Sequence, residues 1–132
     1  MNRIVARFQD GRVLKGFTND FLPAKDHFHL TGDDQPPGSK PIQVGLAELK
    51  ALFFVKTFEG DSKHQESNDP VAGGPAAGRK IRVVFKDGET LVGTTQGYDK
   101  SRPGFFVVPV DRGSNNERCF VVAAATQEVS FL

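Results

Sequence analysis

The stretches FQDGRVLKG (residues 8–16) and FKDGETLVG (residues 85–93) have nearly the same sequence and lie 77 positions apart. In each, an Asp-Gly pair separates two runs in which apolar and polar residues alternate. Such a pair is the strongest short-range signal of a β-hairpin, because both central residues of the tight turn need a positive φ. The sequence therefore predicts two equivalent hairpins, whose turns contain Asp10, Gly11, Asp87 and Gly88.

The similarity extends well beyond the hairpins. When residues 3–55 are placed on residues 80–132 without a gap, 12 of the 53 aligned pairs are identical. The identical pairs include Phe28 with Phe105, far from either hairpin. A fixed offset held over a whole segment is the signature of an internal repeat. We therefore expect two copies of one structural unit.

The segment between the two copies has a different composition. From Ser62 to Gly78 it is polar and then rich in Gly, Pro and Ala, so it cannot bury enough apolar area to fold. We predict a first unit at residues 1–58, a flexible linker at residues 59–78 and a second unit at residues 79–132. Units this small are marginally stable alone, so we expect them to pack against each other or against another chain.

Each unit is predicted to be all-β, with five short strands. The first strand, within residues 3–8, alternates apolar and polar side chains, which is typical of a half-buried strand. Gly16 and Gly93 stand inside the second strand, where a glycine marks a sharp bend or a close backbone approach. Short, strongly bent sheets close into small barrels to hide their edges. The pattern predicts two tandem five-stranded barrels of the SH3-like or Sm-like kind.

The hairpin and the strand after it resemble the first motif of the Sm-like family. That motif has an apolar strand, Asp-Gly, an apolar residue, Gly and an apolar-Asp pair before the next apolar strand. VVFKDGETLVGTTQGYDKSRPGFFVV (residues 83–108) is similar to it, with Tyr98 and Asp99 as the apolar-Asp pair. LKALFFVKTFEGD (residues 49–61) also resembles a segment of an uncharacterised bacterial family. The resemblances imply an uncharacterised bacterial protein with tandem Sm-like repeats.

Resemblance to Sm-like proteins implies RNA binding through an Asn-containing turn and an Arg-Gly turn. In this sequence the corresponding turns read PAKDHF and KSRPGF, then AELKA and ATQEV, so Arg-Gly is absent from both copies. A formal net charge of +1 provides no bulk attraction to phosphate. The candidates for nucleic-acid binding are the basic residues of the turns: Lys25, Lys100, Arg102 and Arg112.

His27 and His29 flank Phe28 and share one face of a predicted strand. Two imidazoles at this spacing can hold a metal ion, with Asp26 or His64 as a third ligand. The alternative is a solvent-facing strand edge opposite a buried Phe28. The second unit carries neither histidine at the matching positions, so the repeat does not preserve the pair.

No combination of acid, base and nucleophile indicates an enzyme, and the turns account for the repeated Asp-Gly pairs. We therefore expect a non-enzymatic protein without a cofactor, which acts as a binding or adaptor module through contacts with another protein. RNA or single-stranded nucleic-acid binding is the second hypothesis. Sensing of a metal or small ligand through the histidine pair is the third.

The single cysteine, Cys119, cannot form an internal disulfide, so nothing indicates secretion. No stretch approaches the roughly 20 apolar residues of a membrane helix, and no signal peptide is recognisable. We therefore expect a cytoplasmic protein. The last strands of the units, ALFFV and EVSFL, are nearly continuous apolar runs that need a partner at an edge. They are candidates for pairing the two units or for forming a homodimer.

Overall fold

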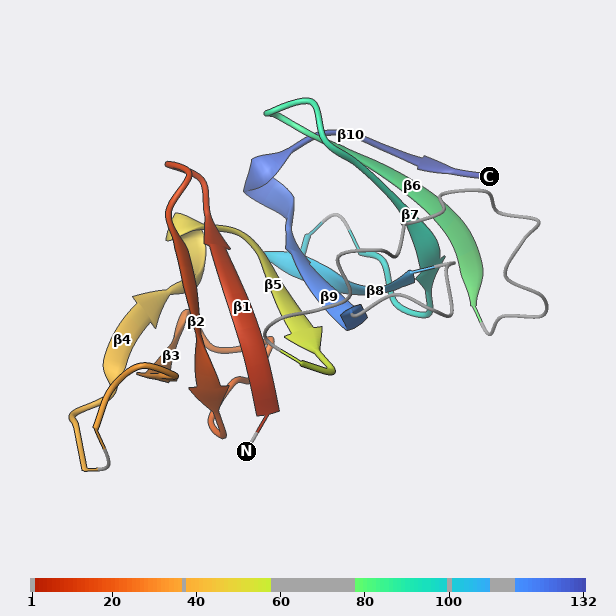
Figure 1. The fold of residues 1–132 in the computed structure, drawn as a ribbon. Helices are drawn as coiled ribbons and strands as arrows, with labels where there is room; N and C mark the ends of the chain where they lie inside the picture. Colours follow the sequence, from red (N-terminus) through yellow and green to blue (C-terminus); the bar gives the residue numbers. More distant parts are fainter. Residues whose placement is uncertain (1, 37, 58–77, 100, 110–115) are drawn as a thin grey trace.

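The computed structural model describes residues 2–36, 38–57, 78–99, 101–109 and 116–132. Within these ranges the chain forms ten β-strands and two short 3₁₀ helices, so the protein is all-β, as predicted (Figure 1). Among the described residues, no helix has the length and apolarity needed to cross a membrane. The predicted linker lies outside the described residues, except for Gly78.

The elements of the two units correspond in order. The first unit contains β1 (Asn2–Phe8), β2 (Val13–Thr18), β3 (His27–Gly32), β4 (Ile42–Gly45), η1 (Leu46–Glu48) and β5 (Leu49–Val55). The second contains β6 (Arg79–Phe85), β7 (Thr90–Thr95), β8 (Gly104–Pro109), β9 (Asn116–Val122), η2 (Ala123–Ala125) and β10 (Thr126–Phe131). Except for β4 and β9, corresponding elements begin 77 residues apart, which is the offset of the sequence repeat.

The described strands form one antiparallel sheet in the order β10-β6-β7-β8-β9-β5-β1-β2-β3-β4. The two units join where β5 pairs with β9, with Leu52 opposite Phe120. The sheet remains open, because β4 and β10 are its outer strands. Two separate closed barrels, as expected from the sequence, are therefore not observed. The physical reason is that β5 pairs on its second side with β9 of the other unit and not with its own β4.

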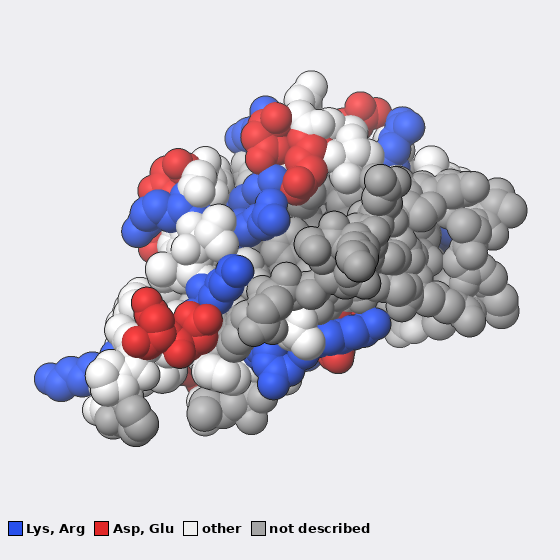
Figure 2. All heavy atoms as spheres, viewed as in Figure 1, with Lys and Arg blue, Asp and Glu red and all other residues white. Residues whose placement is uncertain are grey.

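Charged side chains of both signs are mixed on the surface. Figure 2 shows clusters of Lys and Arg beside clusters of Asp and Glu on the face seen in Figure 1. The clusters of described residues alternate in sign on that face. This distribution fits the formal net charge of +1.

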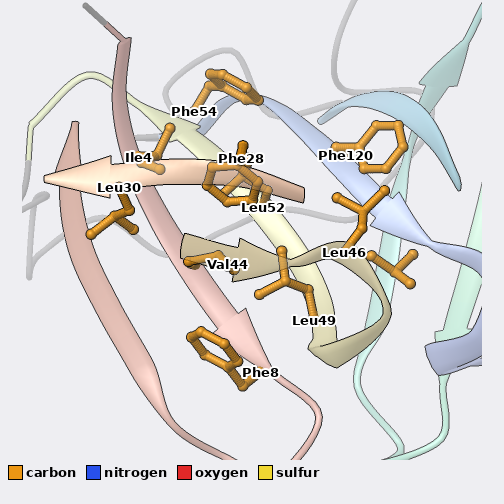
Figure 3. Close-up of a cluster of buried hydrophobic side chains, with 12 residues drawn as sticks. Ile4, Phe8, Phe28, Leu30, Val44, Leu46, Leu49, Leu52, Phe54 and Phe120 are labelled. Carbon is orange, nitrogen blue, oxygen red and sulfur yellow. The ribbon is translucent and has the colours of Figure 1, made fainter. Parts of the chain in front are cut away.

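Strands β5 and β9 contribute to two hydrophobic cores. The core of the first unit takes Leu49, Leu52 and Phe54 from β5 together with Phe120 and Val122 from β9. The core of the second takes Ala51, Phe53 and Val55 from β5 together with Cys119 and Val121 from β9. All residues of β5 are buried, because both of its faces are covered. Figure 3 shows the first core, which Phe120 reaches from the second unit.

The Asp-Gly pairs form the turns of the β1–β2 and β6–β7 hairpins. Gly11 and Gly88 have φ angles of +96° and +93°, which side-chain-bearing residues rarely adopt. Asp10 and Asp87 do not have the positive φ expected from the sequence, since every described residue with a positive φ is a glycine. The reason is that the N–H groups of Gly11 and Gly88 close turns back to Phe8 and Phe85, so each aspartate lies inside a longer turn. The Asp10 carboxylate accepts a hydrogen bond from the backbone N–H of Arg12 at 3.0 Å, and Asp87 accepts the equivalent bond in the second unit. The turns thus give these aspartates and glycines a structural role.

Gly16 and Gly93 allow a close approach between neighbouring strands. A Cβ atom on Gly16 would lie 2.2 Å from the carbonyl oxygen of Thr31 on β3. A Cβ atom on Gly93 would lie 2.2 Å from the carbonyl oxygen of Val108 on β8. Both distances are far below van der Waals contact, so any side chain would push the two strands apart.

We predict that Gly93→Ala lowers the free energy of unfolding by about 2–4 kcal/mol, because the β8 backbone must move to accept the methyl group. Gly97→Ala is the matched control, since a Cβ atom at Gly97 meets no atom within 4 Å. It should change the free energy by less than about 1 kcal/mol. Urea-induced unfolding measures both changes, and equal effects would contradict the close approach.

Lys50 on β5 connects the first unit to the β6–β7 hairpin. Its ammonium nitrogen lies 2.7 Å from Asp87 Oδ2 and 2.7 Å from Glu89 Oε1. The nitrogen also lies 4.7 Å from the centre of the Phe85 ring, and only 10% of the Lys50 side chain is exposed. The hydrogen bond from Lys50 is the main reason that the pKa of Asp87 is lowered.

This ion pair predicts a pH-dependent stability. A carboxyl group with a lowered pKa stabilises the folded state above its unfolded pKa of about 3.9, and the contribution is lost as the pH falls through the lowered folded value. Asp87→Asn should therefore destabilise the protein at pH 7 and have little effect below about pH 3. Thermal unfolding across this range tests the prediction, with Asp33→Asn on the exposed surface as the control. A pH-independent loss would show another cause.

Candidate functional site

One loop follows the second strand of each unit, and the two loops are equivalent. The first loop is residues 19–26, after β2, and the described part of the second loop is residues 96–99 and 101–103, after β7. In the first loop, the backbone N–H of Lys25 donates to the carbonyl oxygen of Leu22 at 3.0 Å. In the second loop, the N–H of Arg102 donates to the carbonyl oxygen of Asp99 at 3.1 Å. Lys25 and Arg102 occupy the same position of the repeat, since they lie 77 residues apart. The two loops therefore present a cation at the same turn.

The end of each loop is tied to the 3₁₀ helix of its own unit. The backbone N–H of Leu46 donates to the carbonyl oxygen of Asp26 at 2.8 Å. The N–H of Ala123 makes the equivalent bond to Pro103 at 2.9 Å. These bonds hold the start of β3 and the start of β8 against the turn that leads into the last strand of each unit.

The two loops line a pocket of about 740 Å³. Ala24 contributes from the first loop, and Gly97 and Arg102 contribute from the second. The rings of Phe106 and Phe120 belong to the same lining and come from β8 and β9. The pocket is therefore built by both units, and its walls are mainly apolar. We call it the inter-unit pocket.

Aromatic packing fixes the wall of the inter-unit pocket. The ring centre of Phe21 in the first loop lies 6.2 Å from that of Phe106 and 5.1 Å from that of Phe120. The guanidinium carbon of Arg118 lies 4.3 Å from the ring centre of Phe54 and 4.9 Å from that of Phe106. Because these rings and the cation come from both units, the pocket depends on the β5–β9 pairing.

Two glycines belong to the lining of the pocket. Gly104 is buried at the start of β8, where a Cβ atom would lie 2.4 Å from the carbonyl oxygen of Val121 and 2.5 Å from the Phe120 ring. Gly97 on the second loop faces open space instead. Gly97 lines this pocket and also a second hollow, so a side chain at position 97 would add bulk at the rim of the pocket without a clash at its Cβ atom.

Arg102 is the one ionisable residue of the pocket lining that the structure describes. Its side chain is 69% exposed and lies 3.9 Å from Asp99, so this ion pair is weak. Asp99 accepts hydrogen bonds from the backbone N–H and the hydroxyl of Ser101, and these bonds lower its pKa. An apolar pocket with a cation at its side suits a ligand that combines an apolar group with a negative charge.

The residues predicted to bind nucleic acid have different positions. Arg102 lines the inter-unit pocket, and Lys25 follows Ala24, which also lines it. Lys100 and Arg112 lie outside the described residues. Of the four predicted cations, Arg102 therefore lines the pocket, and Lys25 lies on the adjacent first loop.

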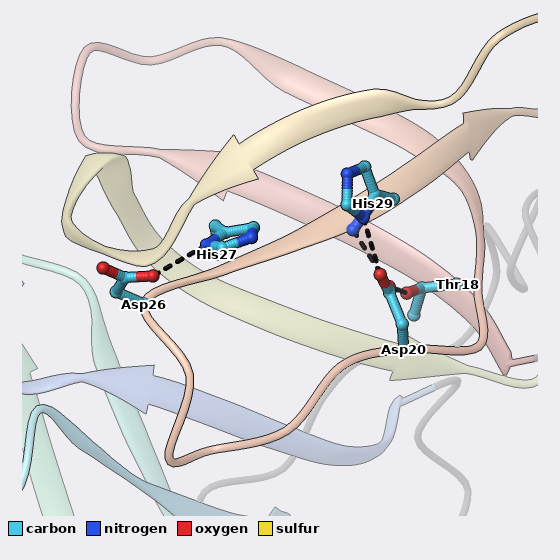
Figure 4. A network of polar contacts seen from close by, with 5 residues as sticks. All are labelled: Thr18, Asp20, Asp26, His27 and His29. Carbon is cyan, nitrogen blue, oxygen red and sulfur yellow. Dashed lines mark hydrogen bonds and ion pairs between the residues drawn. The ribbon is translucent and has the colours of Figure 1, made fainter.

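The two histidines are exposed on β3, and each contacts its own aspartate (Figure 4). The Nδ1 atom of His27 lies 2.7 Å from Asp26, and that of His29 lies 2.6 Å from Asp20. Burial alone would raise the pKa of Asp20, but its hydrogen bonds from His29 and Thr18 outweigh this effect and lower the pKa. The ring centres of the histidines are 5.9 Å apart.

Among the residues that the structure describes, no three His, Cys, Asp or Glu side chains are grouped so as to hold a metal ion. His64, the alternative third ligand, lies outside the described ranges. Metal binding by Asp26, His27 and His29 therefore stays a prediction. Each imidazole already has a carboxylate partner, Asp26 for His27 and Asp20 for His29.

Comparison of the two units shows that His29 lies on a strand face that is exposed in the first unit and covered in the second. His29 lies opposite Gln43 in the β3–β4 pair, and the corresponding residues of the β8–β9 pair are Phe106 and Phe120. On β8 and β9, the face that carries Phe106 and Phe120 packs against the core of the first unit. The equivalent face of β3 and β4, which carries His29 and Gln43, is exposed. One sequence signal could have indicated the pocket. The third strand of the first unit contains the alternating run HFHL (residues 27–30), whereas that of the second contains the continuous apolar run FFVV (residues 105–108), which indicates burial on both faces.

We expect an equimolar amount of Zn²⁺ to leave the thermal unfolding midpoint unchanged, because two imidazoles engaged by separate aspartates do not make a closed site. A zinc ion at 100 times its Kd would instead stabilise the folded state by about 2.7 kcal/mol. Differential scanning fluorimetry compares the two cases. A stabilisation by Zn²⁺ that disappears in His29→Ala would establish the metal site.

Comparison with known proteins places the chain in a family. No curated protein and no solved structure matches it. The model of DUF6982, a family of unknown function, matches residues 1–132. This agrees with the expectation of an uncharacterised family. Because the match spans all 132 residues, the chain belongs to the DUF6982 family of unknown function.

Proposed function

We propose that this protein is a non-enzymatic binding module that holds a segment of a partner protein in the inter-unit pocket. The observation that carries this proposal is the composition of the pocket. Among the described residues, apolar rings from β8 and β9, residues of the two loops and one cation line a volume of about 740 Å³. Pockets of roughly 300–1,000 Å³ with apolar walls and a few polar groups are typical ligand sites.

The chemistry of the lining indicates what the partner segment contains. The partly exposed ring of Phe106 and the apolar residues beside it favour an aromatic or aliphatic side chain, since its burial is driven by the hydrophobic effect. The guanidinium of Arg102 favours a carboxylate, which it can bind through two parallel hydrogen bonds. We therefore expect the partner segment to carry an apolar residue next to Asp or Glu.

The same lining argues for binding and not for catalysis. An arginine stays protonated and cannot act as a general acid or base near neutral pH. The Cys119 thiol is fully buried, and burial raises its pKa, so it is not an available nucleophile. A binding role needs none of these groups, which is why we prefer it to an enzymatic one.

Binding of single-stranded nucleic acid is the second candidate. It is supported by Lys25 and Arg102 on the two loops. It is also supported by the resemblance of the hairpins to the Sm-like motif. That resemblance also favours two related small-barrel units. Such sites use exposed rings on which bases stack. Phe105 and Phe120 are only 3% and 1% exposed, so Phe106 is the one partly accessible ring of this lining. We therefore rank a protein segment first.

We predict that the peptide Ac-Asp-Phe-Glu-Leu-Asp-NH₂ shifts the backbone amide NMR signals of Gly97 and Gly104, whereas a peptide with lysines in place of its acidic residues does not. Gly97→Leu should abolish the shift of the Gly104 signal, because the larger side chain adds bulk at the rim of the pocket. Arg102→Glu should weaken binding about tenfold, because it reverses the charge at the rim. Arg82→Glu, at an exposed position of β6, is the matched control and should bind normally.

Two outcomes would contradict the proposal. Binding of the acidic peptide that survives both Gly97→Leu and Arg102→Glu would place the peptide elsewhere. A twelve-residue oligouridine that moves the Gly97 and Gly104 signals when the acidic peptide does not would favour nucleic acid instead. Its affinity should then fall steeply with added salt, as phosphate contacts require.

A further inference from the structure

The second unit repeats an aromatic arrangement of the first. In the first unit, Phe21 packs against Phe28 and Phe54 with ring centres 5.4 and 5.8 Å apart. In the second, Tyr98 packs against Phe105 and Phe131 with ring centres 4.9 and 5.5 Å apart. Each of these residues has its counterpart 77 positions away.

The two arrangements differ in what covers them. In the first unit, β9 lies beside β5, so Phe120 and Arg118 pack on Phe21 and Phe54. In the second unit, β10 pairs with β6 alone among the described strands. As a result Phe131 is 37% exposed, whereas its counterpart Phe54 is 4% exposed.

The free side of β10 has the backbone groups that a further strand would use. The N–H of Leu132 donates to the carbonyl oxygen of Lys80 on β6 at 3.0 Å. In an antiparallel pair, successive residues direct their backbone groups to opposite sides. The N–H and C=O groups of Val129 and Phe131 therefore point to the edge that has no described strand. Phe131 also lines a hollow of about 350 Å³, together with Arg79 at the start of β6 and Tyr98 on the second loop.

We propose that the free edge of β10 accepts an extended strand of a partner protein, in the way that β9 covers β5. The β5–β9 pair shows the geometry expected for such a strand on β10, because β10 is the counterpart of β5 in the second unit. Addition of a strand to a sheet edge is an established mode of peptide recognition, in which the backbone supplies affinity and alternate side chains supply specificity.

The register of β5 with β9 defines the residues that suit this edge. Leu52 lies opposite Phe120, so the partner residue opposite Val129 should be aromatic and pack towards Tyr98. Ala51 lies opposite Val121, but the counterpart of Ala51 is Glu128, which is exposed and accepts a hydrogen bond from the Ser130 hydroxyl at 3.2 Å. The partner residue opposite Glu128 should therefore be Lys or Arg. The preferred strand thus has an aromatic residue followed by a basic one.

A second copy of this chain does not offer that sequence. The outer strands of its sheet are β10 and β4. Strand β10 contains no Lys or Arg to place opposite Glu128. Strand β4 is the counterpart of β9, but Gln43 stands where β9 has Phe120. Pro41 stands in place of Arg118 and has no backbone N–H to donate. On the neighbouring strand, His29 replaces Phe106. A second copy would place these polar groups on Tyr98 and Phe131, so a different protein is the better partner.

The test uses a peptide with the sequence of residues 116–122 that carries Cys119→Ser and Val121→Lys. Tyr98 is the single tyrosine and the chain has no tryptophan, so tyrosine fluorescence reports binding at this edge directly. We expect a saturable change in fluorescence and new protection of the Val129 and Phe131 amides from hydrogen exchange. A peptide with Phe120→Ala should bind at least tenfold more weakly.

A charge exchange makes the test specific. A peptide with Val121→Glu in place of Val121→Lys should bind the natural protein about threefold more weakly, and Glu128→Lys in the protein should reverse this preference. Arg102→Glu should leave binding of the strand peptide at the β10 edge unchanged. The strand proposal and the inter-unit pocket proposal can therefore fail independently of each other. Absence of binding, or binding unaffected by Glu128→Lys, would overturn the proposal. So would concentration-dependent self-association that the peptide displaces, because a second copy would then occupy the edge.

Discussion

Where β5 pairs with β9, each strand has one face in the core of its own unit and the other in the core of the neighbouring unit. A strand buried on both faces cannot be removed without opening two cores. Each large apolar side chain that it buries contributes about 1.5–3 kcal/mol, so the junction adds substantially to the stability of units that are small by themselves. Lys50 adds a directional contact at the same junction, because it connects β5 to the turn of the second hairpin.

The sequence predicts the elements of this fold better than their assembly. The Asp-Gly turns, the strand that follows each one and the 77-residue offset are local or periodic signals, and all appear in the structure. The partner of β5 is a non-local property. The run LKALFFV indicates burial on both faces, but it does not say which edge covers the strand. This is why closed barrels were expected and one open sheet is observed.

The candidate sites were predicted only in part, for a related reason. Their places in turns make Lys25 and Arg102 predictable as candidates, and Arg102 does line the inter-unit pocket. The sequence does not single out Phe106 and Phe120 from other strand residues, because their role depends on the first unit lying against them. The histidines attracted a metal hypothesis, but their position is the exposed counterpart of that aromatic face. Sequence differences between the two copies therefore mark where the copies have different surroundings.

The shared junction also has a consequence for synthesis on the ribosome. The first unit is translated well before β9, yet its core includes Phe120 and Val122 from that strand. At about 5–20 residues per second, the ribosome takes on the order of 3–13 seconds to pass from Phe54 to Phe120. During that interval β5 has one uncovered, strongly apolar face and edge, so the nascent chain resembles the species that chaperones bind. Folding of the first unit is thus completed only after β9 of the second unit has been translated.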